Sequence, residues 1–247
     1  MRVLSGTFLG RQPPGSSPEI QARRAARAAW SRSDFATVQQ SGFFEPQPSR
    51  HPFDGLIGAE TLIALGDERT SAALRELARQ FPAEAAFLAA RRSRVLGDIE
   101  AAVDHLVEAF DHLRRSPWVY EPIAYRGLVS AEHVAAAATP ADAERLFEAL
   151  TEPFPVMILE ENRRETRLHL LASVDFKRHC AEAFAPLEPY PVWKESELRL
   201  RLECYSQTGH PLAETARREM EAFYAKALIQ LDPALEAPYA ATRRHNG

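Results

Sequence analysis

The sequence predicts an all-α protein, an α-α superhelix built as a row of about six antiparallel helix pairs. Apolar residues recur at the helical period along almost the whole chain, and strand-like runs are nearly absent. Short helix-breaking segments return at a nearly regular interval. A steady interval of this kind is typical of repeat arrays in which each helix pair packs on the next.

The first helix is expected to begin at residue 18. Residues 10–18 are rich in proline, glycine and serine, which predicts that residues 1–17 form a loose N-terminal lead-in. Ser17, Pro18 and Glu19 then provide an N-cap, a proline at the first helical position and an acidic side chain at the positive helix end. We expect one helical-repeat domain over 18–232, followed by a C-terminal tail or cap over 233–247.

Tight turns that carry Asp, Gly or Pro mark the middle of each expected pair. Their spacing averages about 35 residues. The marker residues are Asp34, Asp67, Asp98, Pro140, Asp175 and His210.

Proline-rich breaks alternate with these turns, at 45–48, 81–82, 116–117, 151–155 and 186–191. Proline lacks an amide hydrogen and restricts the residue before it, so each break ends one helix and begins another. The expected first helices are 18–32, 55–65, 83–96, 122–138, 156–173 and 191–208. The expected second helices are 35–43, 68–80, 98–115, 140–150, 175–185 and 211–231. The apolar run 156–159 could be a strand, but the charged residues after it favour the start of a buried helix.

Composition narrows the classes of partner. The hydrophobic content of 45% and the charged content of 26% are ordinary for a globular protein. The net charge of −4 provides no global basic field for nucleic acid or anionic lipid. The sequence contains no apolar run of the roughly 20 residues that span a membrane, and Met1–Gly10 does not resemble a signal peptide. We therefore expect a cytoplasmic protein with no membrane partner.

Two cysteines, Cys180 and Cys204, are too few for a disulfide framework. In a reducing cytoplasm we expect both to be small apolar packing residues. The alternative is that they lie on neighbouring helices and pair.

Residues 96–103, Leu-Gly-Asp-Ile-Glu-Ala-Ala-Val, resemble the inter-helix turn of a tetratricopeptide repeat. Ala102, Leu106 and Ala109 continue the family's alternation of small and large residues. Ser33-Asp34-Phe35 and Val174-Asp175-Phe176 resemble the turn alone, and residues 227–233 resemble a repeat end. The repeat period of the tetratricopeptide family extends over most of the chain, but its sequence motif is found in only about one repeat. A HEAT-type or other helix-pair solenoid therefore remains an alternative.

The resemblance implies a binding surface, because the first helices of tetratricopeptide pairs line a concave groove where basic residues hold acidic partners. On this reading the partner is a protein or peptide with acidic residues, bound by aromatic and apolar contacts and by arginines. The expected partner-binding residues are Phe87, Arg91, Arg94, Arg163, Arg167 and Arg199. The alternative is that the arginines are solvated or paired with Glu84, Glu160 or Glu197.

Sequence patterns of catalysis or metal binding are weak. The chain has neither a phosphate-binding glycine loop nor a nucleophile elbow. His105 and His112 share a helix face with Glu108, but seven residues separate them by about 10 Å, too far for one ion. His179 and Cys180 are adjacent and diverge on a helix. We therefore predict no catalytic residue, metal or cofactor.

Two other functions remain as alternatives to a protein-binding module. One is an enzyme whose site lies between helices and uses some of His133, Glu161, His169 and His179; it requires these side chains to converge in one pocket. The other is a nucleic-acid-binding helical array, which requires an arginine stripe strong enough to overcome the net negative charge.

Overall fold

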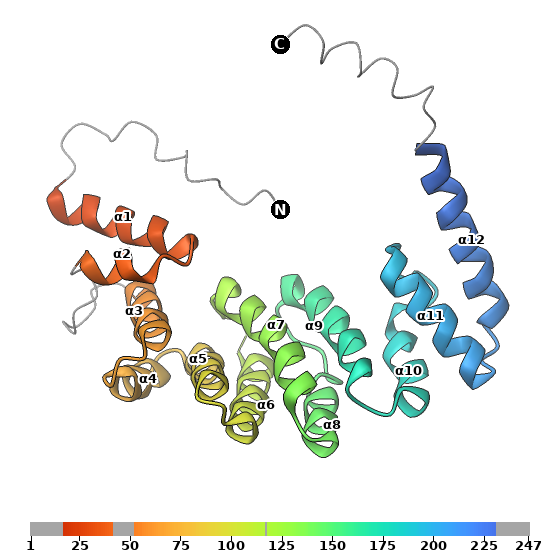
Figure 1. Ribbon diagram of the computed structural model, residues 1–247, viewed down its shortest axis with the longest axis horizontal. Coiled ribbons are helices and arrows are strands. Elements are labelled where there is room, and N and C mark those ends of the chain that lie inside the picture. Colours follow the sequence, from red (N-terminus) through yellow and green to blue (C-terminus); the bar gives the residue numbers. More distant parts are fainter. Residues whose placement is uncertain (1–16, 42–51, 117, 231–247) are drawn as a thin grey trace, which may run out of the picture. The chain divides into compact units, whose positions relative to one another are not determined.

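The computed structural model describes residues 17–41, 52–116 and 118–230 (Figure 1). Within these ranges the chain forms twelve α-helices and two 3-10 helices and contains no strand. The all-helical prediction is confirmed. Residues 1–16 of the predicted lead-in, the proline break at 45–48 and the predicted tail 233–247 lie outside the described residues.

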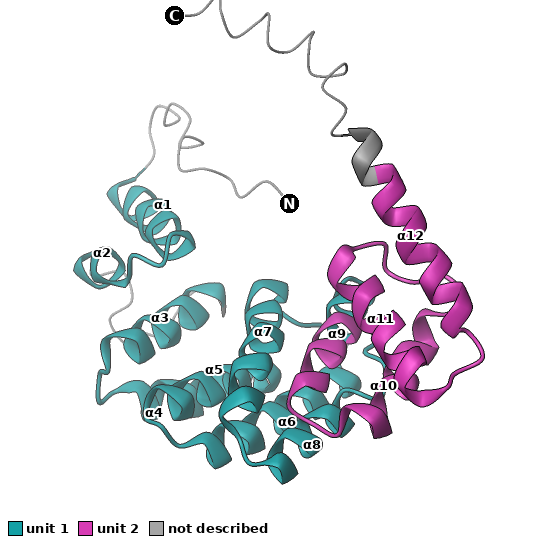
Figure 2. Cartoon of the chain, turned by 45° about the vertical axis from the view of Figure 1, so that its right-hand side comes forward, with its two compact units in different colours: residues 1–163 teal, residues 164–247 magenta. Residues whose placement is uncertain are grey.

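The chain divides into two compact units, residues 1–163 and 164–247 (Figure 2). Helix α9 begins in the first unit and ends in the second. The helices up to this point are α1 Pro18–Ser31, α2 Phe35–Gln40, α3 Pro52–Leu65, α4 Thr70–Ala78, α5 Pro82–Val95, α6 Ile99–Arg115, α7 Glu121–Ala137, α8 Pro140–Ala149 and α9 Met157–His169. The remaining helices are η1 Leu170–Ala172, α10 Phe176–Phe184, η2 Ala185–Leu187, α11 Glu195–Thr208 and α12 Ala213–Gln230. Each expected helix is present within a few residues of its predicted bounds.

The Gly-Asp turns have a common geometry, which the turn between α5 and α6 illustrates. Gly97 takes the left-handed conformation, with φ 79°, and the backbone N–H of Asp98 donates to the carbonyl of Ser93 at 2.9 Å. The side chain of Asp98 then accepts from the backbone N–H of Ala101 at 3.1 Å. One dipeptide thus ends a helix and caps the next one.

Three other turns also have one residue in the left-handed conformation. In each, the backbone N–H of the following residue donates to the carbonyl five residues before it. Their left-handed residues are Gly66, Gly209 and Ser33. Ser33 differs from the glycines, because its Cβ makes a φ of 60° costly.

In the first unit the helices pack with their partners and with the helices of the next pair. Helix α5 contacts α6 within its own pair and also contacts α3 and α7, while α6 contacts α8. Ala102, Leu106 and Ala109 of α6 are completely buried, as the small and large spacing of this helix predicts.

Close packing of α5 on α7 depends on a glycine. A Cβ built on Gly127 would lie 2.0 Å from Cδ1 of the Phe87 ring, a distance that no packed side chain tolerates. Phe87 is itself fixed by an edge contact with Phe110, with ring centroids 5.8 Å apart. Gly127 therefore sets how closely the two helices approach.

In the second unit, α11 contacts both α10 and α12, and a disulfide joins Cys180 of α10 to Cys204 of α11. The expectation that both cysteines are free packing residues is wrong. Helix packing brings their Cα atoms to 5.7 Å, within the range that a disulfide needs. Since disulfides persist in oxidising compartments, the cysteines no longer support a reducing cytoplasm.

A buried charge network also stabilises the second unit. The guanidinium of Arg201 is completely buried and donates from Nε to Glu188 at 2.6 Å and from Nη1 to Glu219. The Tyr205 hydroxyl donates to Glu188 at 2.7 Å. Burial alone would raise the pKa of Glu188, but the hydrogen bonds from Arg201 and Tyr205 outweigh it, and the pKa lies below its ordinary value.

The start of α9 differs from the expected buried helix. Met157 is 84% exposed and Ile158 is 59% exposed, whereas Leu159 is completely buried. The short apolar run thus contributes one side chain to the core and leaves two on the surface. Among the described residues, no helix is both long and apolar enough to cross a membrane.

Candidate binding site

The main polar feature of the first unit is the carboxylate of Glu60, on α3, which is 1% exposed. It accepts hydrogen bonds from Trp30 Nε1 at 2.7 Å and from Arg126 Nη2 at 2.8 Å, and also from Arg91 Nη1. These donors come from α1, α7 and α5. A buried carboxylate is tolerated only when charged or polar donors surround it, and this one has three. We call Trp30, Glu60, Arg91 and Arg126 the Glu60 cluster.

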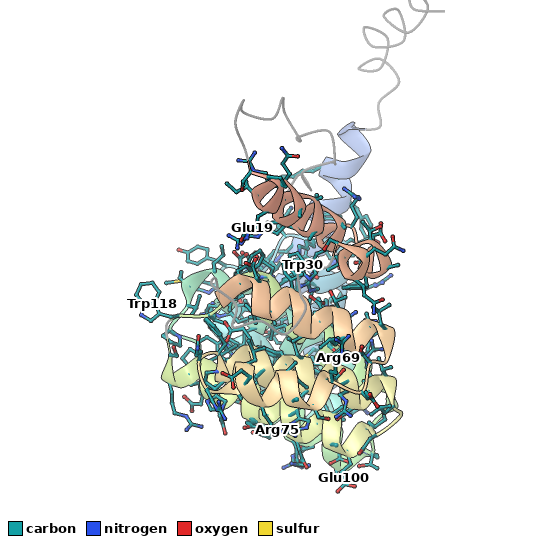
Figure 3. All side chains as sticks on the ribbon, turned by 90° about the vertical axis from the view of Figure 1, so that its left-hand side faces the viewer. Glu19, Trp30, Arg69, Arg75, Glu100 and Trp118 are labelled. Carbon is teal, nitrogen blue, oxygen red and sulfur yellow. A yellow bond between two sulfur atoms is a disulfide. The ribbon has the colours of Figure 1, made fainter. Side chains whose placement is uncertain are left out.

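Aromatic rings hold the two guanidinium groups of the cluster in place. Arg126 lies over the Trp30 ring, with 4.5 Å between its Cζ and the ring centroid, and Arg91 lies 5.6 Å from the centroid of Phe35. In Figure 3 Trp30 lies among the side chains between α1 and the helices that follow, whereas Trp118 projects outward. Ion pairing and cation–π contact together fix both arginines before any ligand arrives.

A hollow of about 30 Å³ opens beside the Glu60 cluster, between α3, α5 and α7. Its lining residues are Glu60, Phe87, Leu88, Arg91, Ile123, Arg126, Gly127 and Ser130. The apolar residues provide a floor, and the two arginines lie beside it with 30% and 40% of their side chains exposed. The hollow thus combines an apolar surface with guanidinium groups that reach solvent.

The electrostatic balance of the hollow is positive. Two guanidinium groups meet one carboxylate there, which leaves one uncompensated positive charge. Burial lowers the pKa of Arg126 below its ordinary value, and the nearby Arg91 adds to this, while Glu60 opposes it. Arginine nevertheless remains protonated in proteins. The hollow therefore favours an anionic group.

A second cluster of arginines and acids lies on α1 and α3. The buried carboxylate of Asp54 pairs with Arg27 at 2.9 Å and with Arg23 at 3.3 Å. Arg27 also lies over the Phe53 ring, 4.8 Å from its centroid, and Phe53 packs on Tyr120 with centroids 4.6 Å apart. Arg23 also pairs with Glu19 at 3.8 Å, so two acids balance the two arginines of this second cluster, which adds no excess positive charge to that of the hollow.

Three of the predicted binding residues lie on α5, in three different settings. Phe87 is buried and forms part of the floor of the hollow. Arg91 belongs to the Glu60 cluster. Arg94, one helical turn further on, is exposed, and we find no ion pair for it among the described residues.

None of the other three predicted arginines is among the residues that line the hollow. Arg163 is buried and pairs with Glu160 through two hydrogen bonds of 2.6 and 2.7 Å, and it also donates to the Leu150 carbonyl. Arg167, in the second unit, is buried and pairs with Glu182. Arg199 is exposed on α11. The pairing of Arg163 with Glu160 is the one that the sequence offered as the alternative to partner binding.

Sequence reasoning missed Glu60, Trp30 and Arg126. Glu60 did leave a signal, because it is a single charge within the apolar stretch Gly58-Ala59-Glu60-Thr61-Leu62-Ile63. A charge at such a position predicts burial with partners. Arg126 left no comparable signal, since its partner Glu60 lies 66 residues away.

The side chains named for an enzyme have separate neighbours. His133 Nδ1 lies 3.0 Å from the Val129 carbonyl oxygen, one helical turn away, and Glu161 is exposed. In the second unit, His169 Nε2 lies 3.9 Å from Glu197, and His179 Nδ1 lies 3.9 Å from Glu182. Each of the three histidines thus has a different contact.

Comparison with protein-family models, with curated proteins and with solved structures finds no significant match to the chain.

Proposed function

We propose that this chain is a protein-interaction module of the tetratricopeptide-like solenoid type, and that the first unit binds an acidic segment of a partner protein. The surface proposed for binding is formed by the first helices α1, α3, α5 and α7. The observation that carries the proposal is the Glu60 cluster, where two partly exposed arginines share one buried carboxylate beside an apolar hollow.

The mechanism of recognition follows from the chemistry of the hollow. A guanidinium group presents a planar pair of N–H donors that matches a carboxylate, so Asp or Glu of the partner has a direct partner at Arg91 or Arg126. Because Trp30 and Phe35 already fix these arginines, little side-chain entropy is lost on binding. An apolar side chain next to the acid would cover the floor of the hollow, as buried anchors do in other interfaces.

The local structure of the third pair supports the tetratricopeptide-like assignment. The Gly97-Asp98 turn, the small residues of α6 and the contacts of α5 with α3 and α7 are all features that an array of such pairs requires. An extended or a helical segment of the partner would lie across the first helices of successive pairs.

Affinity capture followed by mass spectrometry tests the proposal, with the intact chain as bait. Arg94→Glu is the informative variant, because Arg94 is exposed and its replacement breaks no ion pair of the described structure. Arg75→Glu is the matched control: Arg75 is also an exposed helical arginine, but it lies on α4, a second helix. Both variants change the net charge of the chain by the same amount.

We expect the wild type and Arg75→Glu to capture the same partner, and Arg94→Glu to lose it. Capture should also weaken steeply as salt is raised, since the contact is between charges near the surface. Equal recovery of the partner by both variants would overturn the placement of the binding surface on the first helices.

A further inference from the structure

The second unit contains a group of side chains with the geometry of a metal site. Glu165 and His169 lie four residues apart on α9, so both project from one face of that helix. Glu197, on α11, lies next to His169. One ligand atom from each of the three residues lies within 4.8 Å of the other two.

Glu197 is held in place for such a role. It is 4% exposed, and the Ser196 hydroxyl donates to its Oε2 at 2.6 Å. Its Oε1 points toward His169, 3.9 Å from Nε2. A buried carboxylate requires a nearby cation or hydrogen-bond donors, and the Ser196 hydroxyl occupies only one of the two oxygens of Glu197. A hydrogen bond that fixes one carboxylate oxygen and leaves the other directed at the site is typical of residues that support metal ligands.

We propose that Glu165, His169 and Glu197 bind a divalent first-row transition-metal ion such as Zn²⁺. One imidazole nitrogen and two carboxylate oxygens match the ligand preferences of this ion, and three protein ligands leave a position for water. With metal–ligand distances of about 2.0–2.2 Å, the ligand atoms have to approach one another by about 1 Å. Glu165 and His169 retain side-chain exposures of 26% and 40%, which allows this movement.

Lys194 is the competitor for this ion. Its ammonium group pairs with the Glu165 carboxylate, and its side chain is about half exposed. A bound metal has to displace it from Glu165. Removal of this positive charge should therefore strengthen metal binding, whereas removal of a ligand should weaken it.

Titration of the intact chain with Zn²⁺, by calorimetry or against a chromophoric chelator, tests the proposal. His169→Gln removes one ligand and should weaken Zn²⁺ binding by roughly tenfold or more. Lys194→Met should tighten it by about two- to fivefold, because an exposed ion pair no longer competes. His112→Gln is the control for adventitious binding, since His112 lies on α6, 3.6 Å from Glu108, and should leave the affinity within about twofold.

The opposite signs of two of these variants separate ligation from a folding defect, because a loss of structure cannot tighten binding. Circular dichroism of each variant confirms that it is folded. An unchanged affinity in His169→Gln, an unchanged or weaker affinity in Lys194→Met, or an equal loss in His112→Gln would overturn the site. None of these Zn²⁺ affinities depends on partner binding by the first unit, so the metal site and the proposed function can fail independently.

Discussion

Replacement of Glu60 with glutamine removes the charge at the centre of the Glu60 cluster while keeping the size of the side chain. Trp30 and Arg126 both donate to Oε2 of Glu60, so an amide oxygen in that position keeps these two hydrogen bonds. The amide N–H₂ group then replaces Oε1 and faces Arg91, which loses its acceptor. The two guanidinium groups of Arg91 and Arg126 also lose their shared counter-charge.

The size of the effect follows from the exposure of the donors. A hydrogen bond between charged groups contributes about 1.5–3 kcal/mol when it is buried. Arg91 and Arg126 retain 30% and 40% exposure, so water compensates for part of the loss. We expect Glu60→Gln to lower the free energy of unfolding by roughly 2–4 kcal/mol.

Urea denaturation of the wild type and the variant measures this difference, with the unfolding slope compared to check that the unfolded state is unchanged. Glu76→Gln is the matched control, because Glu76 on α4 also pairs with an arginine, Arg79 at 2.5 Å, but both side chains are exposed. Glu76→Gln should lower the free energy of unfolding by less than about 1 kcal/mol. If the two variants lose the same free energy, Glu60 does not hold the cluster together.

Four further variants test other parts of the structure. Gly127→Ala should lower the free energy of unfolding by roughly 1–3 kcal/mol in urea, because its Cβ meets a ring at 2.0 Å; a gain would contradict the close helix approach. Ser33→Gly should raise it by about 1 kcal/mol by relieving the left-handed backbone, seen as a higher melting temperature. Glu188→Gln should destabilise the chain at neutral pH, and its difference from the wild type should disappear as the pH falls through the lowered pKa of Glu188; a pH-independent difference would exclude the charge as its cause. The double variant Cys180→Ala/Cys204→Ala should have a free energy of unfolding lower by about 3–4 kcal/mol, because the disulfide closes a loop between residues 24 positions apart. A reductant should lower the free energy of unfolding of the wild type by the same amount and leave that of the double variant unchanged.

The positions of the helices could be predicted because their limits are determined locally. Asp98 caps a helix with an acceptor three residues from its donor, and Gly97 ends the preceding helix through its own backbone conformation. Proline breaks act through one or two neighbouring residues. Such effects depend on short sequence stretches, so the sequence contains all that is needed to place them.

Pairings between distant residues could not be predicted in the same way. The bond between Cys180 and Cys204 depends on how α10 packs on α11, and the contact of Arg126 with Glu60 joins α7 to α3. Helical period shows which face of a helix is apolar, but it does not show which residue of another helix meets it. For this reason the helical period predicts the position of α5 but does not indicate the carboxylate that Arg91 of this helix contacts.

Phe87 shows the same limit of sequence-based prediction for a single side chain. Phe87 is one of the partner-binding residues expected from the sequence, and it lines the hollow in the structure. Its ring, however, is buried against Gly127 of the next pair. A glycine at a helix contact lets a neighbouring ring approach the backbone, and only the packed structure reveals which ring it is.

The affinity of the captured partner for Arg94→Glu and for Arg75→Glu tests the central claim most directly, because the two variants differ only in which helix carries the reversed charge. When the affinity is measured by calorimetry at low salt, we expect it to fall by about tenfold or more for Arg94→Glu and to change by no more than about twofold for Arg75→Glu. A partner that binds both variants with the same affinity would contradict the claim that the first helices of the first unit recognise an acidic segment.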